Sequence, residues 1–574
     1  MNRRIDNLAI LWWVYYVSTW HLSLISGFTT LSSVQPRSIT TRKTTTSSIK
    51  QLLYASNNNN EISSCDVAIF GGGFGGLYTA LAISNEFQKK FKSKEQKLDI
   101  VLVDPSDRFV FLPLLYDLTV GTASEQEVCP YYKDVLRGTN IRHVKAKLDC
   151  FSSQTTTTIA NLTTSMSSQQ QLSFQSAVIA VGSTPESIIG GVPGAMNYTQ
   201  PFYTREHAIQ TQELLEKLSK QSRPPKIAVV GGGYGGVELA ACVKRRISKG
   251  SVALLTRTPP LEGTRAEPLV NQALSKLGVT IELCGVKSIT KKDDESLQIQ
   301  RTNNENDNND DEICWDAILW TAGSGPCYPV SNNNNNNNKF GSLGLERVSL
   351  SGRLKVDNNL RCSWGTDETM NQQPATTIWA LGDCAEMVNS QPAVPKTASA
   401  AIQQADVVAN NILHELSEKN RISSTSLTSY QTFEFQDLGM MMSLGGPNAA
   451  ILAPTQDDSI FKPLFTPLLD ISRVGLGVAD QVMKQVISKS PEAESLLNTK
   501  LGLSFGGYGL GVDTESTPGT LAGTLAGAAR RAVYAVRMPT NQQRVYAAVS
   551  AALSTANALA KESSSTTNDD DSDK

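Results

Sequence analysis

Two stretches of the chain carry glycines at the spacing G-x-G-x-x-G. They lie within residues 65–81 and 226–241, and each follows a short apolar run and continues into an apolar run compatible with a helix. Such a segment needs glycine because the chain turns tightly, its bare backbone lets a pyrophosphate approach, and the helix packs closely on the strand. The phosphates then meet the positive end of the helix.

Two copies of this motif predict two dinucleotide sites. The residues assigned to the first site are Gly71, Gly73, Phe74, Gly75 and Gly76. The residues assigned to the second site are Gly231, Gly233, Tyr234, Gly235 and Gly236.

The residue that ends the second strand of each unit selects the dinucleotide, because it meets the adenosine ribose. In the first unit this residue is Asp104, whose carboxylate can accept hydrogen bonds from both ribose hydroxyls, which indicates FAD. In the second unit it is Thr256, followed by Arg257. A hydroxyl beside an arginine does not repel a 2′-phosphate, and the arginine adds a cation. The second site is predicted to accept NADPH, with NADH as the alternative donor and an ordinary surface cation as the alternative interpretation of Arg257.

Three further apolar runs end in glycine and small polar residues, at residues 177–185, 317–325 and 377–383. The first two are similar to segments by which the chain of a two-dinucleotide reductase crosses between domains. They add Ala180, Gly182 and Gly323 to the predicted cofactor-binding residues. The third is similar to a second flavin signature, in which Asp383 binds the ribityl chain and the pyrophosphate lies near Gly382.

From residue 65 to about 455, and again from about 520 to 548, the chain resembles the type II NAD(P)H:quinone oxidoreductases, or alternative NAD(P)H dehydrogenases. The closest likeness is to their plant and cyanobacterial branch, which reduces prenylquinones in plastids. Besides the segments above, the likeness is carried by residues 103–116, 202–204, 403–406, 438–445 and 537–540.

The resemblance implies a reaction without proton pumping. Hydride passes from NAD(P)H to FAD, and two electrons then pass to a membrane prenylquinone of the plastoquinone or naphthoquinone type. It implies that Pro113, Leu114 and Leu115 lie beside the isoalloxazine ring and that Glu238 lies near the contact of nicotinamide and flavin. It also admits a homodimer.

The quinone segment departs from the family pattern. The family reads A-Q-x-A-x-Q, whereas residues 398–403 carry Ser399 in place of the first glutamine. Serine keeps one donor and two acceptors but reaches about half as far as the amide. Quinone contact is therefore expected from Gln403, Gln404 or a bridging water, and Lys396 is a candidate to polarise a quinone carbonyl.

The composition disfavours several other functions. A formal net charge of -2 lacks the excess of cations that a nucleic-acid binder needs. No two of the nine cysteines stand at C-x-x-C spacing and the four histidines show no metal-ligand spacing, so neither a metal site nor a redox-active disulfide is predicted. The alternatives are a non-turnover redox-sensing flavoprotein and a sulfide:quinone oxidoreductase-like enzyme, for which only Cys129, Cys327 and Cys362 are conceivable.

The predicted fold is α/β, with two Rossmann-like dinucleotide-binding domains. We expect the FAD-binding domain to comprise residues 61–221 and 351–430, with the NAD(P)H-binding domain at 222–350 inserted within it. A C-terminal membrane-facing module at 431–562, with an insertion at 456–515 that the resemblance does not cover, precedes a disordered tail at 563–574.

Within the C-terminal module, residues 521–537 have apolar side chains at helical spacing. Arg530, Arg531 and Arg537 could meet anionic headgroups at a membrane surface, and packing of the helix on the FAD-binding domain is the alternative.

The first 60 residues are predicted to be a targeting presequence. Arg3 and Arg4 precede an apolar run at 8–25, and residues 29–60 are basic, rich in Ser and Thr, and free of acidic residues. A signal-like part followed by a transit-like part resembles the presequences of complex plastids. We therefore expect a chloroplast protein, peripheral to the thylakoid or associated lipid, with the mitochondrial inner membrane or a retained membrane anchor as alternatives.

Overall fold

The computed structural model describes residues 63–90, 97–154, 157–164, 167–185, 189, 191–293, 295–302, 313–326, 345–363, 376–388, 390, 393–419, 429–445, 448–452, 520–540, 543–547 and 549. The predicted presequence, the insertion at 456–515 and the tail at 563–574 lie outside the described residues.

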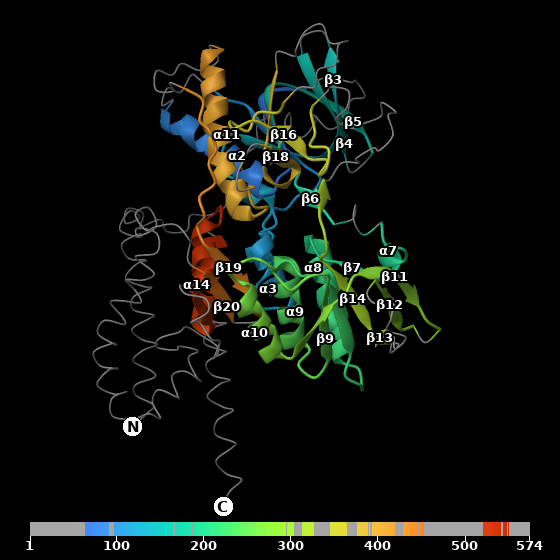
Figure 1. The fold of residues 1–574 in the computed structure, drawn as a ribbon. Coiled ribbons are helices and arrows are strands. Elements are labelled where there is room, and N and C mark those ends of the chain that lie inside the picture. Colours follow the sequence, from blue (N-terminus) through green and yellow to red (C-terminus); the bar gives the residue numbers. More distant parts are fainter. Residues whose placement is uncertain are drawn as a thin grey trace, which may run out of the picture. The chain divides into compact units, whose positions relative to one another are not determined.

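The first glycine motif belongs to a sheet made of β1 (Ser63–Phe70), β2 (Ile100–Asp104), β3 (Ile141–Gln154), β4 (Thr157–Thr164), β5 (Gln169–Ile179) and β17 (Thr377–Ala380). Strands β3, β2, β1, β5 and β17 are parallel neighbours in that order, and β4 pairs antiparallel with both β3 and β5. Helices α2 (Phe74–Lys90) and α11 (Ala398–Glu418) lie side by side against it (Figure 1). The apolar runs before the glycines are buried, as strands covered on both faces require.

The second glycine motif belongs to a parallel sheet in the order β10 (Val279–Leu283), β9 (Ser251–Thr256), β8 (Lys226–Val230), β14 (Ala317–Trp320) and β7 (Gln200–Pro201). Its helices are α8 (Arg205–Ser219), α9 (Tyr234–Arg246) and α10 (Glu267–Leu277). Between β10 and β14 the chain forms a separate antiparallel sheet of β11 (Val286–Lys291), β12 (Leu297–Arg301) and β13 (Cys314–Trp315). The predicted α/β class with two Rossmann-like units is confirmed.

The chain crosses between the two sheets twice, and the crossings lie together. Strands β6 (Ser183–Thr184) and β15 (Gly325–Pro326) pair antiparallel between them (Figure 1). The remaining short elements are η1 (Leu112–Leu114), α3 (Leu115–Thr119), α4 (Glu125–Val128), α5 (Tyr132–Val135), α7 (Ala195–Tyr198), β16 (Leu354–Val356), η3 (Gly382–Cys384) and β18 (Ala385–Met387).

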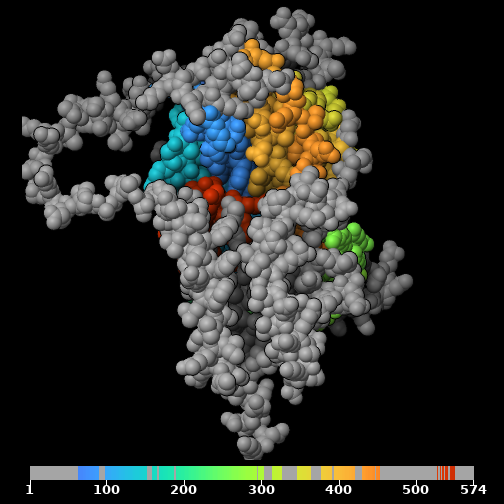
Figure 2. All heavy atoms as spheres, turned by 90° about the vertical axis from the view of Figure 1, so that its left-hand side faces the viewer, coloured from blue at the N-terminus to red at the C-terminus, as the bar shows by residue number. Residues whose placement is uncertain are grey.

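The C-terminal part consists of an antiparallel sheet, β19 (Met440–Ser443), β20 (Ala449–Leu452) and β21 (Thr520–Gly523), followed by α14 (Thr524–Arg537). The described residues from 520 on, in red in Figure 2, lie against the first nucleotide-binding unit, where the Tyr78 hydroxyl donates to the Arg537 carbonyl oxygen at 2.5 Å. Within the described ranges, no helix has both the length and the apolar character needed to span a membrane.

Two of the cations expected to meet headgroups face the protein instead. Arg530 is 1% exposed and Arg531 is 4% exposed, and both guanidinium groups lie within 4 Å of the buried Asp117 carboxylate. The prediction that Arg530 and Arg531 meet lipid headgroups is therefore wrong. Helical spacing shows which positions of a helix are polar, but it does not show that the Asp117 carboxylate packs against two of them.

Candidate cofactor site

The first glycine turn is shaped for a close approach of the backbone. Gly71 has φ of +99°, and a Cβ added there would lie 2.3 Å from the carbonyl oxygen of Ala180. A Cβ on Gly76 would lie 1.8 Å from the Gly71 oxygen, so the helix and the turn touch. A Cβ on Gly73 would meet no atom within 4 Å, so open space lies at the N-terminus of α2. This open, positively polarised end fits a pyrophosphate.

The second turn repeats these contacts. Gly231 has φ of +122°, and a Cβ on Gly236 would lie 1.7 Å from its oxygen. A Cβ on Gly233 would meet nothing within 4 Å, so open space lies at the start of α9 as well. The two turns are therefore equivalent, and the second also fits a dinucleotide.

The strand register settles which residues end the second strands. Phe70 pairs with Val103 in one unit and Val230 with Leu255 in the other, and each pair directly precedes the turn. Asp104 and Thr256 therefore occupy corresponding positions, immediately after those pairs.

The Asp104 carboxylate stabilises the first glycine turn by hydrogen bonds to the backbone. Its Oδ2 accepts from the Gly72 N–H at 2.6 Å and its Oδ1 from the Ser106 N–H at 2.7 Å. Burial raises the pKa of Asp104, and the two backbone donors oppose that shift. Because a carboxylate offers about four lone-pair sites, acceptor capacity is left for ribose hydroxyls.

The corresponding Thr256 is buried, and its hydroxyl donates to the carbonyl oxygen of Thr258 at 2.8 Å. The next residue, Arg257, is exposed. The second site therefore has a buried hydroxyl where the first has a carboxylate, and an exposed cation at the next position.

Sequence reasoning missed Tyr132. Its hydroxyl donates to the Gly72 carbonyl oxygen at 2.8 Å, and its ring lies 4.6 Å from that of His143, centroid to centroid. Gly72 is thus held at its N–H by Asp104 and at its carbonyl by Tyr132. Because Tyr132 is 60 positions from Gly72 and belongs to no motif, no local pattern signals the contact.

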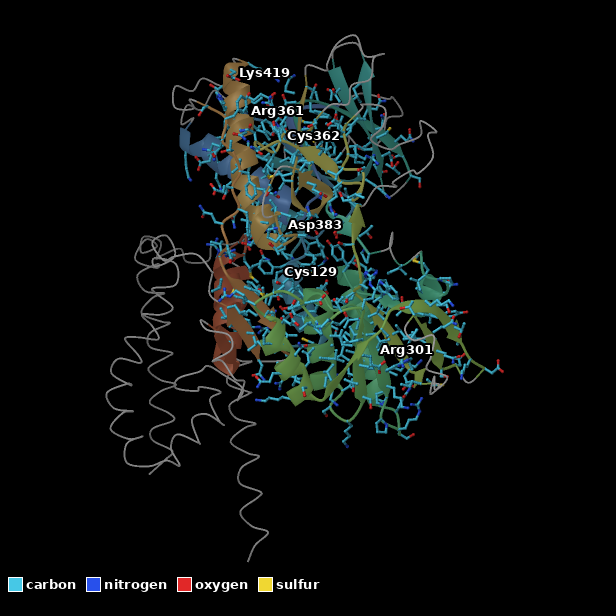
Figure 3. All side chains as sticks on the ribbon, viewed as in Figure 1. Cys129, Arg301, Arg361, Cys362, Asp383 and Lys419 are labelled. Atoms are coloured by element: carbon cyan, nitrogen blue, oxygen red, sulfur yellow. The ribbon has the colours of Figure 1, made fainter. Side chains whose placement is uncertain are left out.

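The predicted second flavin signature lies beside the first crossing segment, since β17 and β5 pair through Ala380 and Ile179. Gly382 has φ of +73°, and its N–H donates to Oε1 of Gln404 at 2.8 Å. Oδ2 of Asp383, labelled in Figure 3, accepts from the Ser183 hydroxyl at 3.0 Å. The structure therefore brings this signature and Gln404 together.

The three side chains expected to contact quinone all bind backbone atoms. Gln404 binds Gly382, as above, and the Gln403 amide exchanges two hydrogen bonds, each of 3.0 Å, with the backbone of Gln436. Nζ of Lys396 donates to the Ala385 carbonyl oxygen at 2.7 Å. Desolvation lowers the pKa of Lys396, and the nearby Arg353 guanidinium lowers it further.

The segment expected beside the flavin ring contacts the nicotinamide motif. Leu114 and Leu115 are buried, and the next residue, Tyr116, stacks on Phe202 with ring centroids 5.2 Å apart. A Cβ on Gly235 would lie 3.1 Å from the Tyr116 hydroxyl oxygen. The ends of the two predicted cofactor sites therefore meet at this segment.

Glu238 on α9 lies close by and is 7% exposed. Burial raises its pKa to about 7, although the Arg530 guanidinium and the Ser443 N–H both favour the charged form. Its charge can therefore change near neutral pH.

The described cysteines are free thiols. Burial raises the pKa of Cys129 to about 12 and that of Cys362 well above its ordinary value. Both thiols stay protonated at neutral pH and are poor nucleophiles. Cys327 lies outside the described residues.

Two adjoining dinucleotide sites on two linked sheets define a flavin-dependent nicotinamide oxidoreductase. The family model of pyridine nucleotide-disulphide oxidoreductases matches residues 65–405, and the chain belongs to this family. Within the family it groups with the type II NAD(P)H:quinone oxidoreductases, as the sequence predicted, and its cofactors are FAD and NAD(P)H.

The similar proteins match about two thirds of this chain or slightly more. The alternative NAD(P)H-ubiquinone oxidoreductase C1, chloroplastic/mitochondrial, of Arabidopsis thaliana is 31% identical over 67% of this chain and 72% of its own length. The demethylphylloquinone reductase NdbB of Synechocystis is 28% identical over 67% of this chain and 86% of its own. The solved structure of NDH2 from Plasmodium falciparum in complex with NADH shares the fold, with a TM-score of 0.52 at 18% identity over 71% of this chain and 94% of that one.

Proposed function

We propose that the protein oxidises NADPH, with NADH as the less favoured donor, and reduces a prenylquinone held in a membrane. The observation that carries the donor preference is the equivalence of Asp104 and Thr256, with the exposed Arg257 beside the latter. A carboxylate at the second position would repel a 2′-phosphate, whereas a hydroxyl and a guanidinium accept it.

Bound FAD supplies hydride acceptance from the nicotinamide and two-electron reduction of the quinone. The chain's own residues bind the two nucleotides and orient their reacting rings. The turns that begin at Gly71 and Gly231 hold the two pyrophosphates, and Asp104 holds the flavin nucleotide's ribose. Residues 113–115 support the isoalloxazine ring, and Glu238 faces the nicotinamide.

On the quinone side we propose Lys396, Gln403 and Gln404. Gln404 contributes by holding Gly382, since its amide oxygen is already bound there. Lys396 and Gln403 each donate an N–H to a backbone carbonyl oxygen. Each donor can instead bind a quinone carbonyl oxygen when quinone is present. The two curated relatives described above are named for reactions with quinones.

The membrane contact is proposed at the helical turn 543–547 and at Val549. Val545, Tyr546 and Val549 are 49%, 40% and 53% exposed, and the neighbouring Arg544 is exposed. Exposed apolar side chains beside a cation suit the interface of an anionic bilayer. Arg530 and Arg531 have no part in this contact, because they are buried.

The compartment is proposed to be a chloroplast, with the enzyme peripheral to the thylakoid or associated lipid. A relative whose name reads chloroplastic/mitochondrial and another from a cyanobacterium support this, as does the presequence composition. The mitochondrial inner membrane is the alternative.

Steady-state assays of the purified holoenzyme test this proposal. NADPH and NADH are compared as donors with a short-tail plastoquinone and with ferricyanide, which needs no quinone site. We expect kcat/KM for NADPH to equal or exceed that for NADH with both acceptors. A much larger kcat/KM for NADH would overturn the donor assignment, and ferricyanide reduction without quinone reduction would overturn the quinone assignment.

Membrane contact is tested by co-sedimentation with anionic liposomes. Replacing Val545, Tyr546 and Val549 by serine should abolish liposome binding and retain ferricyanide reduction. The matched control replaces the similarly exposed Met196 and Leu283 by serine, which should retain both. Undiminished liposome binding by the triple variant would reject the proposed surface.

A further inference from the structure

A cluster of buried charges joins three separate parts of the chain beside the nicotinamide motif. Arg530 on α14 and Asp117 on α3 are each 1% exposed. Nη2 of Arg530 donates to Asp117 Oδ2 at 3.0 Å and lies 3.9 Å from Oε1 of Glu238 on α9. The same Nη2 donates to the Pro113 carbonyl oxygen at 2.6 Å, in the segment expected beside the flavin. Buried charges are tolerated only when paired, so these groups depend on one another.

Glu238 is the member of the cluster whose charge changes most readily. Its Oε1 accepts from the Ser443 N–H on β19 at 2.7 Å. The titratable and charged groups that face it from α3, α9 and α14 are Tyr116, Asp117, Cys242, Arg530 and Tyr534. Among these groups, Arg530 supplies the positive charge that favours the ionised carboxylate.

We propose that Arg530 is a positioning residue that sets the charge of Glu238 and thereby couples the seating of α14 to nicotinamide binding. The inference rests on the proposed place of Glu238 beside the nicotinamide. When α14 is seated, the guanidinium favours the Glu238 carboxylate, which attracts the positively charged ring of an oxidised nicotinamide. When α14 is displaced, Glu238 loses this cation and takes up a proton at a higher pH than in the seated state.

The same helix leads to the proposed membrane contact. Its last carbonyl, that of Arg537, accepts from the Tyr78 hydroxyl, and Nε2 of the buried Gln543 donates to the Glu127 carbonyl oxygen at 3.1 Å. The exposed Val545 lies two positions after Gln543. Contact of this turn with a bilayer therefore acts on the element that carries Arg530.

Arg531 provides a matched control on the same helix. Its Nη2 donates to the Thr122 carbonyl oxygen at 2.6 Å and lies 3.4 Å from Asp117 Oδ1, on the α3 side of the cluster. Arg531→Gln removes a buried cation of α14, as Arg530→Gln does, but leaves the contacts of Arg530 with Asp117 and Glu238 in place. A general loosening of α14 would affect both variants alike.

The experiment measures the dissociation constant of NAD⁺, which lacks the 2′-phosphate that titrates at about pH 6, for the full-length oxidised holoenzyme, by calorimetry, from about pH 5.5 to about pH 8.5. In the wild type, binding should tighten with rising pH, with a midpoint near the Glu238 pKa of about 7. Arg530→Gln should raise the midpoint by on the order of 1 pH unit, which lowers the ionised fraction of Glu238 and weakens binding about 5-fold at pH 7. Arg531→Gln should leave the midpoint unchanged, and Arg530→Lys should raise it less than Arg530→Gln.

An unchanged midpoint in Arg530→Gln would overturn the inference. If that variant does not retain flavin, Arg530→Lys decides, because equal midpoints in Arg530→Lys and Arg531→Gln would overturn it too. Glu238→Gln should remove the pH dependence. If Glu238→Gln keeps the wild-type pH dependence, the proposed role of Glu238 itself fails, and that failure is distinguishable from a failure at Arg530.

Discussion

Replacement of Asp104 by alanine should release FAD. The substitution removes the acceptor of two backbone hydrogen bonds, at 2.6 Å to Gly72 and 2.7 Å to Ser106, together with the proposed acceptor of the ribose hydroxyls. A hydrogen bond to a charged group contributes about 1.5 to 3 kcal/mol, so the loss of one ribose contact alone raises the FAD dissociation constant about 10- to 150-fold. The loosened Gly72 turn adds to this, and we expect an increase of at least about 100-fold.

Two further variants should raise the FAD dissociation constant by smaller amounts. Asp104→Asn keeps one acceptor oxygen and should fall between alanine and wild type. Tyr132→Phe leaves the carboxylate but removes a neutral hydrogen bond to the Gly72 carbonyl, worth about 0.5 to 1.5 kcal/mol, so the dissociation constant should rise only about 2- to 10-fold. The assay is flavin absorbance per protein after gel filtration, followed by FAD titration of apoprotein. Full flavin occupancy of Asp104→Ala, with an unchanged dissociation constant, would refute the reasoning.

The same carboxylate predicts an acid limit to flavin retention. Burial raises the pKa of Asp104, so its protonated form, the poorer acceptor, appears at a higher pH than for a solvated aspartate. FAD affinity should therefore be full above the Asp104 pKa and fall as the pH drops through it. Titration of apoprotein with FAD across the acid range measures this, and Asp104→Asn should lack the fall.

Three further substitutions test the rest of the site. Thr256→Glu should shift the ratio of kcat/KM values toward NADH, because a carboxylate repels the 2′-phosphate and accepts from ribose hydroxyls; an unchanged ratio would show that this strand end does not select the donor. Gly236→Ala should abolish NADP⁺ binding with FAD retained, because its Cβ would lie 1.7 Å from the Gly231 carbonyl oxygen, and calorimetry detects the loss. Gln404→Ala should raise the FAD dissociation constant about 2- to 10-fold, since it frees the Gly382 N–H from one neutral hydrogen bond. An unaltered FAD titration would mean that water replaces the amide.

The local features of the cofactor site follow from the sequence alone. A strand, a glycine turn and a helix occupy consecutive residues, and the left-handed φ of Gly71 and Gly231 is a requirement that glycine meets at little cost. The positions of Asp104 and Thr256 could be predicted for the same reason, since each ends a short apolar strand that must be buried beside the first. These inferences depend only on neighbours in the chain.

The partners of polar side chains were decided by the tertiary structure. Arg530 and Asp117 are 413 positions apart, and the spacing of residues 521–537 predicts a helix with arginines but not that two of them are buried. Likewise, Gln404 was expected at the quinone, yet its amide binds Gly382, 22 positions away. A periodic pattern records which positions are polar, whereas the group that satisfies a buried charge or amide is set by which distant segment packs against it.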